Sequence, residues 1–173
     1  ATFTAGSSTV KFAVDAAVTN LFAGTFTGAS SMYNLEFSPV LNGNYTYAGG
    51  AAITVSNNFS IIPTGIRDLV YEMGGANTIT GTLLIQPGAG NATVDTISGS
   101  NYDLSAGNID IEAQGIILAN NSAITVSTNW TNFGTFTPGN STVTLNTANT
   151  AVVTGPTTFY NLTITHTSAK EVN

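Results

Sequence analysis

Apolar and polar residues alternate along most of this chain, in short runs of four or five residues. Typical runs occupy positions 9–12, 53–56, 108–112, 124–127 and 142–145. Alternation with a period of two predicts strands that bury one face, whereas apolar residues rarely recur at the three- and four-residue spacing of a helix. The pattern therefore predicts an all-β protein. Glycine and asparagine separate the runs and predict tight turns at 49–50, 74–75, 88–90, 105–108 and 120–121.

Three pairs of segments resemble each other in the same order along the chain. Residues 2–12 match 135–145 at seven of eleven positions, and a second match extends this similarity so that 2–37 resembles 135–164. The third match pairs 52–60 with 123–131 and aligns Phe59 with Trp130. The length fits one domain, so we interpret residues 1–173 as a single all-β domain with internal repeats.

Each repeated unit holds only a few short strands and must stack on its neighbours to bury its apolar face. We therefore predict a β-solenoid resembling a parallel β-helix, with apolar ladders inside and hydroxyl residues outside. Asparagine amides stack at the corners of such coils, and Asn57, Asn58, Asn129 and Asn161 suit those places. The alternative is a β-sandwich with strand exchange between subunits, because the chain has no strict period of about 20 residues.

Residues 123–145 and 158–164 resemble the repeats of large bacterial surface proteins with parallel β-helix character, such as filamentous haemagglutinin and autotransporter passengers. The resemblance is best over 1–61 and 108–165. It implies an exported adhesin, stalk or fibre and carries no catalytic signature. The segment 63–73 departs from the pattern and is predicted to form a loop or cap.

Composition excludes several classes of function. Charged residues make up 7% of the chain and the net charge is −6, with Lys11, Arg67 and Lys170 as the only basic residues apart from one histidine. So few basic groups cannot neutralise a run of phosphates, so no nucleic-acid partner is expected. Cysteine is absent, and no apolar stretch reaches the roughly 18 residues of a membrane-spanning helix, so membrane insertion is not expected.

The acidic residues are the first place to look for chemistry. Asp110 and Glu112 project from one face of a predicted strand, with Asp95 and Asp103 before them. A carboxylate pair is what polysaccharide hydrolysis needs, but basic residues that stabilise charge are lacking nearby, so we assign no catalytic residue and no cofactor. A calcium site at Asp103, Asp110 and Glu112 is a secondary hypothesis. His166 is the single histidine, which excludes a histidine-pair metal site within one chain.

Three further surface features are candidates for recognition. Thr-x-Thr recurs at 2/4, 25/27, 78/80, 135/137, 142/144 and 163/165 and predicts outward hydroxyl rows, as on an ice-binding surface. Tyrosines 33, 45, 47 and 71 with Trp130 are candidates for a sugar-binding platform, although Phe59 and Trp130 share a repeat position that favours the core. Seven Asn-x-Ser/Thr sequons are candidates for glycosylation, at Asn44, Asn58, Asn91, Asn120, Asn129, Asn140 and Asn161.

The sequence thus favours a non-enzymatic structural subunit or repeat segment of an extracellular filament, stalk or adhesin at the cell surface. Because the last segment repeats the first, we expect self-association head-to-tail through terminal strands. The alternatives are a carbohydrate-binding adhesin domain that recognises surface glycans, a polysaccharide-active β-helix enzyme and an ice-binding protein.

Overall fold

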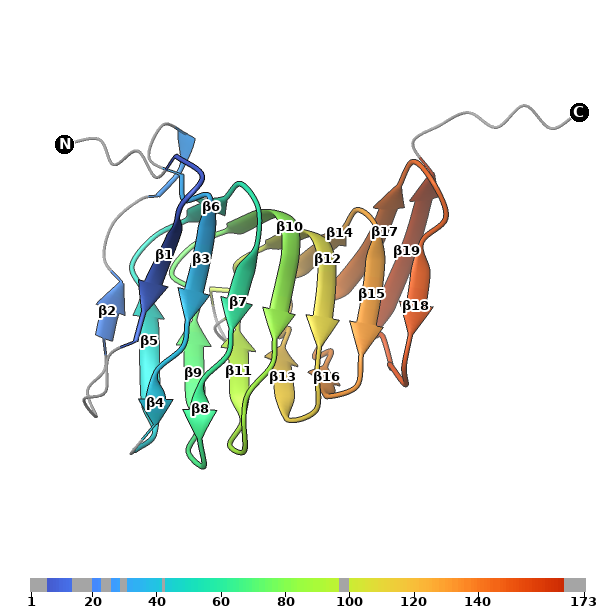
Figure 1. Ribbon diagram of the computed structural model, residues 1–173. Helices are drawn as coiled ribbons and strands as arrows, with labels where there is room; N and C mark the ends of the chain where they lie inside the picture. The colour runs from blue at the N-terminus through green and yellow to red at the C-terminus, as the bar shows by residue number, and fades with distance from the viewer. Residues whose placement is uncertain are drawn as a thin grey trace, which may run out of the picture.

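The chain coils into a β-solenoid of roughly six turns (Figure 1). The computed structural model describes residues 6–13, 20–22, 26–28, 31–41, 43–96 and 100–166. Within these residues every regular element is a strand and every strand pairing is parallel. The predicted β-solenoid is therefore confirmed. The sandwich alternative is wrong, because its sheets are built from antiparallel strands.

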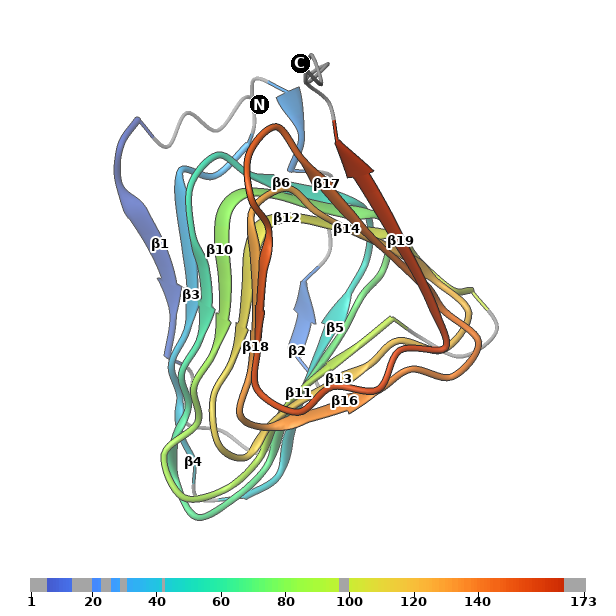
Figure 2. The ribbon, with the colours of Figure 1, turned by 90° about the vertical axis from the view of Figure 1, so that its right-hand side faces the viewer.

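Viewed along its axis, the coil is a triangle whose three sides are crossed in the same order in each turn (Figure 2). The first side holds β1 (Thr9–Phe12), β3 (Asn34–Phe37), β7 (Phe59–Ile61), the later parts of β10 (Asn77–Ile85) and β12 (Leu104–Ile111), β15 (Asn129–Asn132) and β18 (Val152–Thr154). The second side is a six-stranded sheet of β2 (Asn20–Phe22), β5 (Tyr45–Gly49), β9 (Leu69–Glu72), β11 (Ala92–Asp95), β13 (Gly115–Leu118) and β16 (Thr135–Thr137).

The third side closes each turn. It holds β6 (Ile53–Val55), the early parts of β10 and β12, β14 (Ala123–Val126), β17 (Thr142–Thr147) and β19 (Asn161–His166). The short strands β4 (Val40–Leu41) and β8 (Thr64–Gly65) pair at the corner between the first and second sides. Because the chain runs down the first side and up the second while it advances from β1 to β19, the coil is right-handed (Figures 1 and 2).

Two long strands turn the corner between the third and first sides without a break. β10 pairs with β6 through Asn77–Ile79 and with β7 through its last three residues, with a register irregularity between Ile79 and Thr82. Gly81 and Gly107 lie at this bend, where a Cβ on Gly107 would be 2.3 Å from the carbonyl oxygen of Thr80. The turn predicted at 105–108 is therefore wrong, because glycine here lets a strand bend while it stays paired.

The segment 63–73 also differs from its prediction. Its last part is strand β9, which pairs with β5 on one side and β11 on the other. Leu69, Tyr71 and Met73 point inward and are fully buried, so this segment completes an ordinary turn of the coil. Only the corner around Ile66 and Arg67 projects as an exposed loop.

Inward side chains form continuous columns along the solenoid axis. One column on the first side consists of Leu35, Phe59, Leu83, Ile109 and Trp130, each no more than 1% exposed. The aligned repeat positions Phe59 and Trp130 thus lie in the same core column, as their alignment predicts. Columns of this kind bury apolar area in every turn, which is the main favourable contribution to folding.

Aromatic rings gather at two places in this core. Phe37 makes edge-to-face contacts with Phe12, Tyr47, Phe59 and Tyr71, with centroid separations of 4.8–5.6 Å. A second cluster near β19 joins Trp130, Phe136 and Phe159. Such pairs add to the stabilisation from buried area. The core therefore depends on aromatic packing at both ends of the solenoid.

Candidate functional site

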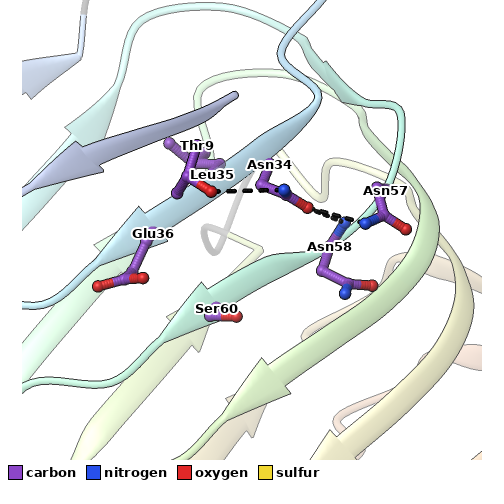
Figure 3. Close-up of a pocket in the computed structure, with 7 residues that line it drawn as sticks. All are labelled: Thr9, Asn34, Leu35, Glu36, Asn57, Asn58 and Ser60. Atoms are coloured by element: carbon purple, nitrogen blue, oxygen red, sulfur yellow. Dashed lines mark hydrogen bonds between the residues drawn. The ribbon is translucent and has the colours of Figure 1, made fainter. Parts of the chain in front are cut away.

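A shallow polar cavity of about 230 Å³ lies on the first side, near the corner with the third side. Side chains from β1, β3, β7 and the turn before β7 line it (Figure 3). They are Thr9, Asn34, Leu35, Glu36, Asn57, Asn58 and Ser60. Its lining of amides, hydroxyls and one carboxylate is suited to hydrogen bonding.

Hydrogen bonds within the protein already engage much of this lining. Asn34 Oδ1 accepts bonds from Asn57 Nδ2 at 3.0 Å and from the backbone N–H of Asn58 at 3.2 Å, while Asn34 Nδ2 donates to Thr9 Oγ1 at 3.4 Å (Figure 3). Glu36 accepts a bond from Lys11 Nζ at 2.7 Å. That hydrogen bond lowers the pKa of Glu36. The cavity therefore has a structural explanation in the stacking of β1, β3 and β7.

The amides of the cavity belong to a longer column that we call the asparagine ladder. It consists of Asn34, Asn58, Thr82, Asn108 and Asn129, one residue per turn at the start of each first-side strand. Asn58 Oδ1 accepts the backbone N–H of Thr82 at 2.9 Å, Asn108 Nδ2 donates to Thr82 Oγ1 at 3.3 Å, and Asn129 Oδ1 accepts the backbone N–H of Val152 at 3.2 Å. Each side chain thus satisfies a polar group of an adjacent turn.

The ladder confirms the predicted corner positions of Asn58 and Asn129, and Asn57 joins it through Asn34. Asn161 donates to Thr142 Oγ1 at 3.5 Å on the third side. Sequence reasoning missed Asn34 and Asn108. The signal that identifies them is an asparagine followed directly by an inward apolar residue, as in Asn34-Leu35 and Asn108-Ile109. The distance in sequence between such pairs changes because the turns differ in length.

A second outward column runs along the third side and carries only hydroxyl residues. It consists of Thr54, Thr78, Ser105, Thr125, Thr144 and Thr163, each the register partner of the next. We call it the hydroxyl column. Its members are half-buried or exposed. The predicted outward hydroxyl rows are present here in part, through Thr78, Thr144 and Thr163. The pair 135/137 lies on the second side, and residues 2, 4 and 25 lie outside the described residues. The column's other three members were missed because they belong to no Thr-x-Thr pair.

The acidic residues do not gather into a metal site. Asp103 lies where β12 begins on the third side and its Oδ1 accepts the N–H of Ala123 at 3.0 Å, whereas Asp110 lies on the first side beyond the bend at Gly107. Glu112 follows β12 at the next corner. Within the described residues no group of three or more His, Cys, Asp or Glu side chains is placed to hold a metal ion. Because β12 turns a corner between its two ends, the structure does not bring Asp103 together with Asp110.

Asp110 has an unusual environment for a carboxylate, because its Oδ1 is buried with no hydrogen-bond partner among the described residues. Its register partners are Leu84 and Thr131. Desolvation by burial raises the pKa of Asp110 above its ordinary value of 3.8. Asp95, in contrast, accepts a bond from Asn120 Nδ2 at 2.8 Å on the second side.

The proposed sugar-binding platform does not exist as a surface. Tyr45, Tyr47, Tyr71 and Trp130 are at most 3% exposed and point into the core, and Tyr71 accepts a bond from Asn77 Nδ2 at 2.8 Å. Burial raises the pKa of Tyr71 to about 12. Of the five residues proposed for the platform, only Tyr33 lies at the surface. The sequence could not separate these cases, because tyrosine occurs both as a core residue and as a contact for sugars.

The seven sequons differ in what their asparagines do. Six side chains take part in hydrogen bonds between turns: Asn44, Asn58, Asn91, Asn120, Asn129 and Asn161. Asn140 is exposed in the turn between β16 and β17, and its side chain makes no hydrogen bond with any described residue. A glycan on Asn140 would therefore disturb no bond between turns. His166 ends β19, beside Thr147 of β17.

Comparisons with known proteins give no relative. No family model, no curated protein and no solved structure matches this chain. No helix of the described residues is long and apolar enough to cross a membrane.

We predict that Asn58→Ala lowers the free energy of unfolding by about 0.5–1.5 kcal/mol, because it leaves the Thr82 N–H of the adjacent turn without its side-chain acceptor. Chemical denaturation of the purified protein measures this. The matched control is Asn140→Ala, which removes an exposed amide and should change stability by less than about 0.5 kcal/mol. Equal effects of the two variants would contradict the structural role of the ladder.

We also predict that Asp110→Asn stabilises the protein at pH 7. The raised pKa means that the folded state binds the Asp110 proton more tightly than the unfolded state, so the charged form costs stability above the folded pKa. This cost disappears as the pH falls below 3.8. Thermal melts of the two proteins should therefore differ at pH 7 and converge near pH 3. Glu112→Gln removes the same charge without a buried unpartnered oxygen, and it should give no such gain.

Proposed function

We propose that this chain is a structural subunit or repeat segment of an extracellular filament, stalk or adhesin, and that it assembles head-to-tail through its terminal strands. We assign no catalytic residue and no cofactor. The partner is a second copy of the chain, and the place is the cell surface.

The observation that carries this proposal is the exposure of core positions on the last turn. Leu162 and Ile164 belong to the same inward columns as Val143 and Leu145, which are at most 2% exposed. Yet Leu162 is 44% and Ile164 is 69% exposed, because β17 covers only one edge of β19. Open edges of this kind pair readily with another strand.

The distribution of charge supports stacking of this kind. Each outward residue of a solenoid lies about 4.8 Å from its counterparts in adjacent turns, so like charges would repel at each turn. Lys11 and Glu36 form the single ion pair between side chains of the described residues, and they pair between two turns with opposite signs. Residues 150–165 at the other end carry no charged side chain. Association of the two ends therefore meets no charge repulsion from these residues.

The resemblance of residues 123–145 and 158–164 to bacterial surface-protein repeats adds support of a different kind. The β-solenoid fold agrees with that resemblance, and so does a surface whose polarity is hydroxyl and amide. Solenoids in which adjacent turns make most contacts extend by adding turns, which suits a fibre or stalk.

We predict that the purified chain forms filaments visible by electron microscopy and that Ile164→Lys raises the critical concentration for assembly about tenfold or more, because a lysine would be buried unpaired at the junction. The control is Ile66→Lys, at an equally apolar and 75% exposed position in a corner loop away from the ends. It should assemble normally. A chain that stays monomeric at high concentration, or equal losses in both variants, would contradict the proposal.

The hydroxyl column favours a second candidate function, the binding of ice. Six hydroxyl residues at the spacing of adjacent turns form a regular row on one side of the triangle, and a periodic row of donors and acceptors is what an ordered water lattice can match.

For this candidate we predict that the chain slows ice recrystallisation and that Thr125→Tyr, in the middle of the hydroxyl column, abolishes the effect. Thr46→Tyr, an outward position of the second side, should leave it unchanged. Ice growth that is the same with this chain as with an inert protein at equal mass would exclude the function.

A further inference from the structure

The two ends of the described coil are related in a way that defines how copies would stack. The first strand, β1, lies on the first side, and the last, β19, lies on the third side, which is the last side of a turn (Figure 2). The strands from β1 to β19 therefore make up whole turns. After β19 the next place along the described coil is the first side of a further turn, over β18, and β1 is itself a first-side strand.

We infer that copies stack in phase, with β1 of the next copy pairing in parallel along the edge of β18 that no described strand covers. This inference rests on the proposed head-to-tail assembly and specifies its register. Thr9 of the incoming copy lies over Val152, Val10 over Val153, and Lys11 over Thr154, because these residues occupy equivalent columns of the first side.

The same register covers the other exposed apolar residues of the last turn. Phe26 pairs with Ile53, and the column of Ile53 leads through Ile124 and Val143 to Leu162. In-phase stacking therefore brings Phe26 of the next copy over Leu162, as Val10 comes over Val153. Val153 and Leu162 are each 44% exposed and Val10 and Phe26 are partly buried, so both surfaces of the junction are apolar and accessible.

The internal repeats of the sequence point to a competing register. β1 and β3 resemble β17 and β19, with the same pairing of Thr9 with Asn34 as of Thr142 with Asn161, and with the same asparagine-to-threonine bond. By that analogy β1 would stack on β19, which rotates each copy by a third of a turn. With β1 on β19 the next copy begins on the third side, and the first and second sides of that turn hold no strand. We therefore favour the in-phase register.

Paired cysteines distinguish the two registers, because the chain has no cysteine of its own. The variant Lys11→Cys/Thr154→Cys tests the in-phase register, and Lys11→Cys/Thr163→Cys tests the rotated one. Six turns separate residue 11 from residue 154 in one chain, about 30 Å, so a short bis-maleimide can join them only between copies. Assembled material is treated with the reagent and resolved on a denaturing gel.

We expect a ladder of covalent multimers from the 11/154 pair and mostly monomer from the 11/163 pair. A ladder from the 11/163 pair instead would overturn the in-phase register in favour of the rotated one. Filaments in which neither pair reacts would overturn the strand pairing and leave the filament function standing. Failure of the parent chain and both variants to assemble would remove the proposed function and this register together.

Discussion

Parallel pairing between adjacent turns is the interaction on which the rest of this structure depends. In this arrangement each residue lies directly over its counterpart in the next turn, so side chains meet others in equivalent environments along the whole axis. Apolar residues such as Phe59 and Trp130 therefore stack into core columns, and asparagines such as Asn58 and Asn129 stack at a corner. The fold, the ladder and the open ends are all consequences of this one geometry.

The same geometry explains why the chain avoids charge. Amides and hydroxyls both donate and accept hydrogen bonds, so they can stack on their own kind, whereas carboxylates only accept and repel one another. Asp110 shows the cost, because its neighbours in the column, Leu84 and Thr131, leave one oxygen buried and unpartnered. Lys11 and Glu36 show the permitted exception, in which opposite charges stack. Hydroxyl and amide polarity is thus a requirement of the fold before it is evidence of any function.

Local alternation was sufficient to predict the strands, because a buried strand face imposes a period of two, and the internal repeats favoured the β-solenoid over the sandwich. The sequence shows no fixed period for the coil, because the number of residues in a turn varies. Residues that stack in adjacent turns are 26 positions apart for Leu83 and Ile109 but 19 apart for Thr125 and Thr144. Turns of different length keep the columns in register while they hide the repeat. The bend in β12 was missed because glycine at position 107 suggests a turn, whereas the strand stays paired on both sides of it. The same bend separates Asp103 from Asp110, which the calcium hypothesis had placed together.

Each turn of a solenoid is stabilised by the turns on both sides of it, but the last turn has a neighbour on one edge only. Its other edge therefore leaves backbone groups and apolar side chains uncovered. The third side shows this directly, because Val143 is fully buried while Leu162, one turn further along the same column, is 44% exposed. No chemistry beyond that of the core is needed to fill this edge, since another turn of the same kind satisfies both its backbone groups and its apolar side chains. In the proposed assembly, an identical copy supplies such a turn when its β1 lies on the first side, over β18, after β19 has closed the third side of the previous copy. Folding would then continue across a chain boundary, and the register of the junction would follow from the register of the core.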